Sequence, residues 1–167
     1  MGKTCAFFGN DYDFMHGRKR VRCPNLKLKE LIKKQAIRLI EQENVTDFLV
    51  GQIGGFEQDA YDTVLEIKND YPHIRVILVI SRVSELNPMQ KDYSGYIFYG
   101  RYFDDFIFPD KCATGYKRCC IIYCNRYIVE NSDFIISYNR YKSRAYEFCR
   151  AATDKGVTVI ELAGTDN

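Results

Sequence analysis

The run Phe48-Leu49-Val50-Gly51-Gln52-Ile53-Gly54-Gly55-Phe56 places glycines directly after a short apolar segment and ahead of a helix-like segment that extends to about Tyr71. Glycine at a strand-to-helix turn lets the backbone approach a ligand closely, and the first turn of the next helix presents N–H groups at the same place. This arrangement favours an anion, most often a phosphate. A purely structural turn is the alternative, which the loop alone leaves open.

Outward from this loop, apolar strand-like segments alternate with segments of helical periodicity. Strands are predicted at 4–8, 47–51, 74–80, 133–137 and 156–162, and helices at 28–40, 56–71, 117–131 and 143–155. Alternating strands and helices imply right-handed crossovers. Gly156 is predicted to follow a helix end, where a positive φ is needed. We therefore expect a three-layer Rossmann-like α/β fold, with a mostly parallel central sheet and helices on both faces.

Two stretches lack such periodicity. Residues 81–114 contain two prolines, several tyrosines and the short apolar stretches 96–98 and 105–108, and we predict a long connection that acts as a lid or a dimer contact. The other is a polar loop after the first strand, with a basic patch at Arg18, Lys19, Arg20 and Arg22.

Composition sets further bounds. The 167 residues suffice for one core, so one domain spanning 1–167 is expected. The net charge is only +2, from 24 Lys and Arg against 22 Asp and Glu, so nothing global requires nucleic acid or an anionic membrane. The start Met1-Gly2-Lys3 lacks the apolar region of a signal peptide, and no apolar run is long enough to span a bilayer. A cytoplasmic protein without a membrane partner is predicted.

The seven cysteines are predicted to be reduced and partly buried thiols. Cys119, Cys120 and Cys124 cluster, but no histidine lies nearby and their spacing differs from the C-x2-C pair of most zinc sites. Neither a metal nor a cofactor is therefore predicted.

Three loops are expected to meet at one edge of the sheet, because ligands of parallel sheets bind beyond the carboxyl ends of the strands. These loops are Gly9-Asn10, Gly51 to Phe56, and Tyr138 to Arg144.

The order of these loops resembles that of the SLOG superfamily, the Rossmann-like group that includes the DNA-processing protein DprA and the LOG cytokinin-activating enzymes. The resemblance covers nearly the whole chain and is greatest to a small, uncharacterised bacterial and phage branch. Its motifs are matched here by Phe7-Phe8-Gly9-Asn10, by Gly51 to Glu57, and by Cys124-Asn125-Arg126 ahead of Ser132-Asp133-Phe134-Ile135. A homodimer is what this resemblance implies.

The fourth loop departs from the family pattern. LOG-like enzymes carry Pro-Gly-Gly-x-Gly-Thr-x-x-Glu, whereas this chain has Asn139 to Glu147 and retains only Glu147 in position. Without glycine the backbone cannot approach a phosphate as closely, although Ser143 can cap a helix and Arg140, Lys142 and Arg144 can supply charge.

Three functions follow from these residues. The first is binding or sensing of a nucleotide or nucleotide derivative. The second, implied by LOG-like phosphoribohydrolases, is cleavage of a nucleotide N-glycosidic bond, with Glu147 as the catalytic carboxylate and Arg126 or Arg144 as the cation. The third is binding of single-stranded DNA as in DprA, which the near-neutral charge disfavours. Structural alternatives are a first-turn helix carboxylate for Glu147 and a surface pair with Glu130 for Arg126.

The binding hypothesis assigns the phosphate to the glycine loop, a charged clamp to Arg126, and base or ribose contact to an aromatic ring such as Phe56 or Tyr138. The predicted ligand-binding residues are Gly9, Asn10, Gly51, Gln52, Gly54, Gly55, Phe56, Asn125, Arg126, Ser143 and Arg144.

Overall fold

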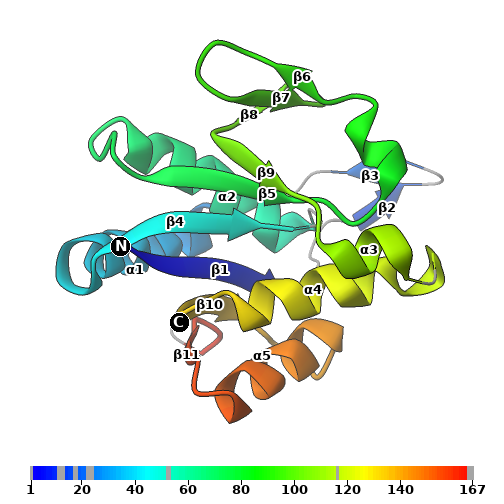
Figure 1. The fold of residues 1–167 in the computed structure, drawn as a ribbon. Coiled ribbons are helices and arrows are strands. Elements are labelled where there is room, and N and C mark those ends of the chain that lie inside the picture. The colour runs from blue at the N-terminus through cyan, green and yellow to red at the C-terminus, as the bar shows by residue number, and fades with distance from the viewer. Residues whose placement is uncertain are drawn as a thin grey trace.

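A parallel sheet forms the centre of the computed structural model, which describes residues 2–10, 14–16, 19–21, 25–51, 54–115 and 117–164. In the described chain, this sheet has six strands in the order β11-β10-β1-β4-β5-β9, all paired in parallel (Figure 1). Its strands are β1 (Lys3–Gly9), β4 (Val45–Val50), β5 (Arg75–Val79), β9 (Asp105–Ile107), β10 (Phe134–Tyr138) and β11 (Thr158–Glu161). The chain runs outward from β1 to β9 and then returns to β10 beside β1, so the strand order reverses between β1 and β10.

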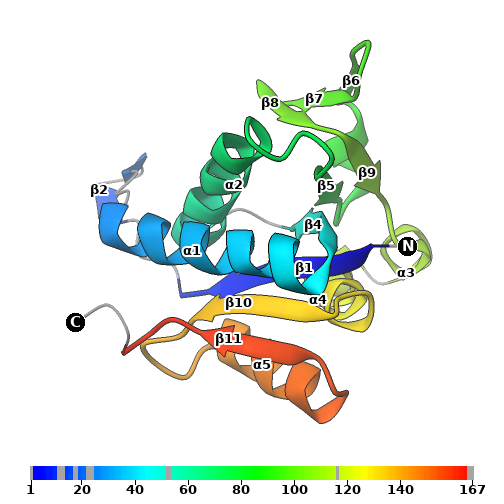
Figure 2. The same ribbon diagram turned by 90° about the vertical axis from the view of Figure 1, so that its left-hand side faces the viewer.

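Helices cover both faces of this sheet (Figure 2). They are α1 (Leu26–Glu43) and α2 (Gly55–Lys68) on one face, and α4 (Cys120–Glu130) and α5 (Arg144–Asp154) on the other. Strand alternation assigns side chains to the two layers: Cys5 and Phe7 of β1 pack with α1 and α2, whereas Ala6 and Phe8 pack with α4 and α5. The predicted three-layer Rossmann-like fold is confirmed.

The segment 81–114 is more ordered than predicted, and its interpretation as a long connection is wrong. It contains η1 (Val83–Leu86), β6 (Gln90–Lys91), β7 (Tyr96–Phe98), β8 (Arg101–Phe103), β9 and α3 (Asp110–Thr114). Strands β6, β7 and β8 form a small antiparallel sheet, and β9 extends the central sheet beyond β5. These strands have two or three residues each, too few to show a period of two in the sequence.

Smaller differences concern element boundaries. In the polar segment after β1, β2 (Phe14–His16) pairs antiparallel with β3 (Lys19–Val21). The helix predicted at 117–131 begins as a 3-10 turn, η2 (Lys117–Cys119), ahead of α4. Gly156 follows Lys155, the C-cap of α5, and has the predicted positive φ, at 85°.

Within the part of the chain that the structure describes, none of the helices combines the length and apolar character needed to cross a bilayer.

Gly9, the last residue of β1, lies against the Phe56 ring of α2. A Cβ at Gly9 would lie 2.7 Å from the Phe56 Cβ and closer still to its ring carbons, whereas the nearest atom to one at Gly51 would be the terminal Cδ1 of Ile128, at 2.8 Å. We expect Gly9→Ala to lower the free energy of unfolding by about 1–3 kcal/mol, because a buried ring near its own backbone cannot move aside. Gly51→Ala is the matched control and should lose less, since a terminal methyl group can rotate away. Urea denaturation of both variants measures the difference, and equal losses would contradict the packing argument.

Candidate functional site

Asn10 fastens together two of the loops predicted to converge. Its side-chain Nδ2 donates to Ser143 Oγ at 2.8 Å, and its Oδ1 accepts from the backbone N–H groups of Arg140 at 2.6 Å and Tyr141 at 3.2 Å. Its own N–H donates to the Tyr138 carbonyl at 2.8 Å, and the residue is 4% exposed. The side chain of Asn10 is therefore committed to holding the end of β1 to the loop after β10.

Ser143, at the other end of this contact, caps α5. Its Oγ accepts from the Tyr146 N–H at 3.4 Å as well as from Asn10. The predicted capping role of Ser143 is confirmed, and Asn10 orients the hydroxyl that performs it.

Phe56 belongs to the core. Its ring has no exposed surface and stacks on Tyr138, with the ring centroids 6.1 Å apart. Neither ring faces solvent, so neither side chain is presented to a ligand in this structure. Gly9 is the last residue of β1, and its N–H donates to Glu57 Oε1 at 3.1 Å.

Gly51 lies at the carboxyl end of β4, where α4 approaches from the other face of the sheet. A Cβ at Gly51 would lie 3.9 Å from Asn125 Oδ1, so the structure brings these two predicted residues together. Gly54 is the N-cap of α2 and Gly55 is its first residue. Gln52, also a predicted ligand contact, lies outside the described residues.

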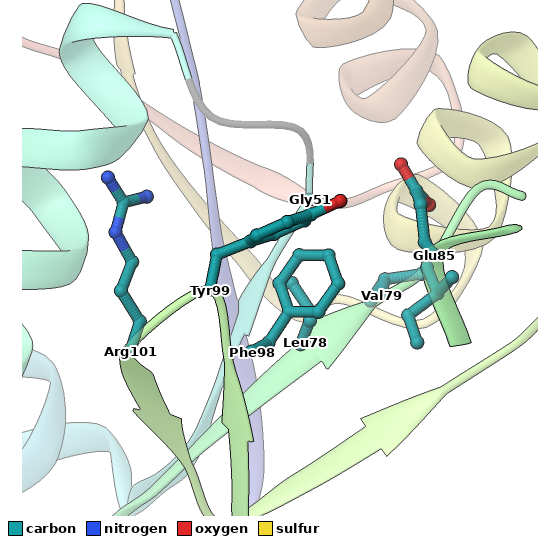
Figure 3. Close-up of a pocket in the computed structure, with 8 residues that line it drawn as sticks. Gly51, Leu78, Val79, Glu85, Phe98, Tyr99 and Arg101 are labelled. Atoms are coloured by element: carbon teal, nitrogen blue, oxygen red, sulfur yellow. The ribbon is translucent and has the colours of Figure 1, made fainter. Parts of the chain in front are cut away.

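A pocket opens at this edge, and we call it the strand-end pocket (Figure 3). It has a volume of about 440 Å³. Its walls come from the ends of β4 and β5, from η1 and from the β7–β8 hairpin, and its lining residues are Gly51, Leu78, Val79, Ile80, Glu85, Phe98, Tyr99 and Arg101. An apolar floor with a few polar groups at its rim is typical of small-molecule sites.

The tip of the β7–β8 hairpin carries two aromatic rings to this pocket. Tyr99 and Gly100 form a two-residue turn with φ of 48° and 74°, the positive values that type I′ turns require. The rings of Phe98 and Tyr99 meet edge-on, with centroids 4.6 Å apart, and Tyr99 is 73% exposed. Figure 3 shows the Tyr99 ring extending over the pocket beside Phe98.

Arg101 supplies a cation at the side of the pocket nearest α2. Its guanidinium carbon lies 6.0 Å from the ring centroid of Tyr61, a residue of α2. The Tyr61 hydroxyl donates to the Tyr102 carbonyl at 2.9 Å, and burial raises the pKa of this phenol to about 12. Tyr61 therefore stays neutral at physiological pH and holds β8 beside α2.

Asp104 anchors the hairpin to the central sheet. Its carboxylate accepts from Lys68 Nζ at 2.9 and 3.0 Å, from the Val76 N–H at 2.7 Å and from the Tyr102 hydroxyl at 3.0 Å. Lys68 Nζ also donates to the Ile74 carbonyl. These bonds join α2, β5 and β8 at one partly buried carboxylate, which fixes where the hairpin and its tip lie.

The remaining predicted residues line a different cavity, which we call the helix groove. Arg126, Arg144 and Glu147 are exposed residues of α4 and α5, and all three border this groove of about 490 Å³ between the two helices. Gly51 lines the strand-end pocket and not the helix groove. Glu130, the predicted surface partner of Arg126, forms an ion pair with Lys155 at 3.0 Å. The hydrogen bond from Lys155 is the largest cause of the lowered pKa of Glu130, and the nearby charge of Arg126 lowers that pKa further.

The clustered cysteines are mostly core thiols. Cys120 and Cys124 are buried, and the Cys124 Sγ lies 3.5 Å from the Val79 carbonyl oxygen. Cys119 is partly exposed. Among the described residues, no group of three or more His, Cys, Asp or Glu side chains is placed to hold a metal ion.

The segment 81–114 supplies the pocket residues that the sequence analysis did not single out: Glu85, Phe98, Tyr99 and Arg101. Two signals in the sequence could have identified these residues: the aromatic stretches of 81–114 and the prediction that this segment forms a lid. Nothing in a single sequence showed that β8 returns beside α2.

The fold and pocket define a Rossmann-like α/β protein with a hairpin-covered pocket at the carboxyl ends of its strands. No model of a known protein family matches the chain. Over 52 residues, it is 35% identical to the UPF0398 protein of Brevibacillus brevis. This stretch covers 31% of the chain, and the chain matches only 27% of that relative's length. This short match supports only a general relationship between the two proteins, and the name of the relative states no activity.

Asp104→Asn tests whether this carboxylate holds the hairpin in place. Removing its charge weakens the bonds from Lys68 and Val76, and we expect the free energy of unfolding to fall by about 1–3 kcal/mol. Asp154→Asn removes the same charge from the exposed end of α5 and should change it by less than about 0.5 kcal/mol. Urea denaturation of the two variants gives the comparison. A loss no larger than that of the control would show that Asp104 does not anchor β8.

Thiol alkylation tests the burial of the cysteines. Burial raises the pKa of Cys124 to about 12 and that of Cys149 to about 11, so both stay protonated at pH 8 in the folded protein. Among Cys119, Cys124 and Cys149, we expect iodoacetamide to modify partly exposed Cys119 first, and to modify the other two rapidly only after unfolding in urea. Mass spectrometry of timed samples measures the order. In the unfolded chain these two thiols ionise at a lower pH than in the folded protein. The free energy of unfolding should therefore fall as the pH rises from about 8.5 toward the pKa values of the folded thiols.

Proposed function

We propose that this protein binds a nucleotide or nucleotide derivative in the strand-end pocket. The observation that carries the proposal is the placement of Arg101, two aromatic rings and Gly51 around one pocket at the carboxyl ends of β4 and β5. Open α/β sheets bind their ligands at this edge.

The phosphate is assigned to the side of the pocket where Arg101 lies. Gly51 lines the pocket, and α2 begins four residues later at Gly55 with the positive end of its dipole at this edge. Arg101 lies beside α2 through its contact with Tyr61. A guanidinium and a helix N-terminus on one side of the pocket favour an anionic group there.

The aromatic component of the ligand is assigned to Phe98 and Tyr99. Every nucleobase has a flat face that stacks on such rings, and stacking requires no particular base. The exposed Tyr99 ring therefore takes the role that the sequence analysis gave to Phe56 or Tyr138, both of which are buried.

The hydrolase alternative has less support. It needs a carboxylate at the ribosyl carbon, and Glu147 borders the helix groove while Gly51 borders the strand-end pocket. For the DNA-binding alternative, Arg18 and Arg22 lie outside the described residues. SLOG membership and a homodimer remain proposals that rest on the loop motifs and the Rossmann-like topology.

A thermal-shift screen with nucleoside mono- and diphosphates, ADP-ribose and cyclic nucleotides tests the proposal. At least one ligand should raise the melting temperature without being consumed, and Arg101→Gln should weaken its binding by roughly ten- to a hundredfold because a charged hydrogen bond is lost. Arg150→Gln removes an equal charge from the exposed face of α5 and should leave binding unchanged.

Two results would contradict this proposal. The absence of a shift with every phosphate ligand would remove it altogether. Release of free base, abolished by Glu147→Gln, would replace binding alone with hydrolysis.

A further inference from the structure

Glu85 presents a carboxylate at the side of the strand-end pocket opposite Arg101. Figure 3 shows the two charged side chains on either side of Phe98 and Tyr99. The proposed phosphate position next to Arg101 leaves Glu85 facing the other end of the ligand. A carboxylate at that position accepts hydrogen bonds and repels a second anion.

The carboxylate of Glu85 is held in place by the chain itself. Its Oε2 accepts from the backbone N–H groups of Ser81 at 2.9 Å and Arg82 at 3.0 Å. Both donors lie just beyond the carboxyl end of β5, so the orientation of the side chain is set by the central sheet. A group oriented in this way can discriminate between ligands, because it does not turn aside to suit each one.

The second oxygen of Glu85 retains hydrogen-bonding capacity. In the described part of the chain, the contact of Oε1 is with Ser81 Oγ, at 3.4 Å, while the same hydroxyl lies 3.2 Å from Oε2. A contact of 3.4 Å is at the long end for an O–H donor, and a carboxylate oxygen can accept two hydrogen bonds. Oε1 is therefore able to accept a bond from a ligand.

We propose that Glu85 is a specificity-determining residue, which selects ligands that carry an O–H or N–H donor at the end remote from the phosphate. This inference rests on the proposed nucleotide binding at the same pocket. The donor is either a hydroxyl of the sugar or an amino group of the base. A ligand without it leaves Oε1 without this hydrogen bond, and a ligand with a second phosphate there meets a like charge.

The first test compares ligands on the wild-type protein by isothermal titration calorimetry. AMP and GMP are each compared with their 2′-deoxy and 3′-deoxy forms, and AMP is compared with purine riboside 5′-monophosphate, which lacks the amino group. Loss of the donor that contacts Glu85 should weaken binding roughly tenfold or more. The deoxy compounds identify a sugar donor, and the purine compound identifies a donor on the base.

The second test uses Glu85→Gln. The amide oxygen can still accept from Ser81 and Arg82, so the loop keeps its anchor, while the other position changes from an acceptor to a donor. Binding of the parent nucleotide should fall roughly tenfold, to the level of the analogue that lacks the donor, and binding of that analogue should not change. Glu30→Gln, on the exposed face of α1, is the charge-matched control and should bind as the wild type does.

The outcomes separate the two proposals. Failure of AMP, GMP and all of their analogues to bind the wild-type protein would remove nucleotide binding of this kind, and the role of Glu85 with it. Binding without discrimination among the analogues would leave nucleotide binding intact and overturn the role of Glu85. If Glu85→Gln does not fold, as judged by circular dichroism, the comparison on the wild-type protein decides.

Discussion

Burial of the central sheet on both faces constrains where this protein can place polar groups. Strands β1, β4, β5 and β10 send alternate side chains into two apolar layers, and a polar group in either layer is costly unless it is paired. Functional groups are therefore confined to the strand ends and to the elements that cover them. Asn10 illustrates this constraint, since its amide lies just past β1 and is satisfied by the loop after β10.

The same constraint explains how an inserted hairpin comes to line a pocket. The segment between β5 and β9 crosses the carboxyl edge of the sheet, and Asp104 ties its returning strand to β5 and α2. Tyr61 adds a second attachment, because its ring contacts Phe103 and its hydroxyl bonds the backbone of β8. Arg101 and the aromatic tip are thus placed by contacts that are remote from the pocket itself.

The sequence predicted the features that local pattern determines and missed those that depend on distant contacts. Continuous aliphatic strands and amphipathic helices identified the Rossmann-like fold, and the glycines after β4 indicated the edge of the sheet at which the strand-end pocket opens. The strands of 81–114 were missed because two or three residues show no periodicity. Phe56 was assigned to a ligand because no local signal shows that Gly9, 47 positions earlier, leaves room for its ring in the core. Arg126 and Glu147 were assigned to the same site as the glycine loop through the family motifs that they match, and those motifs do not show that both residues border the groove between α4 and α5.

The turn at Tyr99 exposes an aromatic side chain at a cost in backbone conformational energy. A tyrosine with φ of 48° occupies a conformation in which glycine or asparagine is more stable, and a turn that only reversed the chain would be served better by either. Replacement of Tyr99 by glycine or asparagine would relieve this strain and would remove the ring that extends over the pocket. Under the proposed function, the strained backbone at Tyr99 marks a position where selection for stability and selection for ligand binding act in opposite directions.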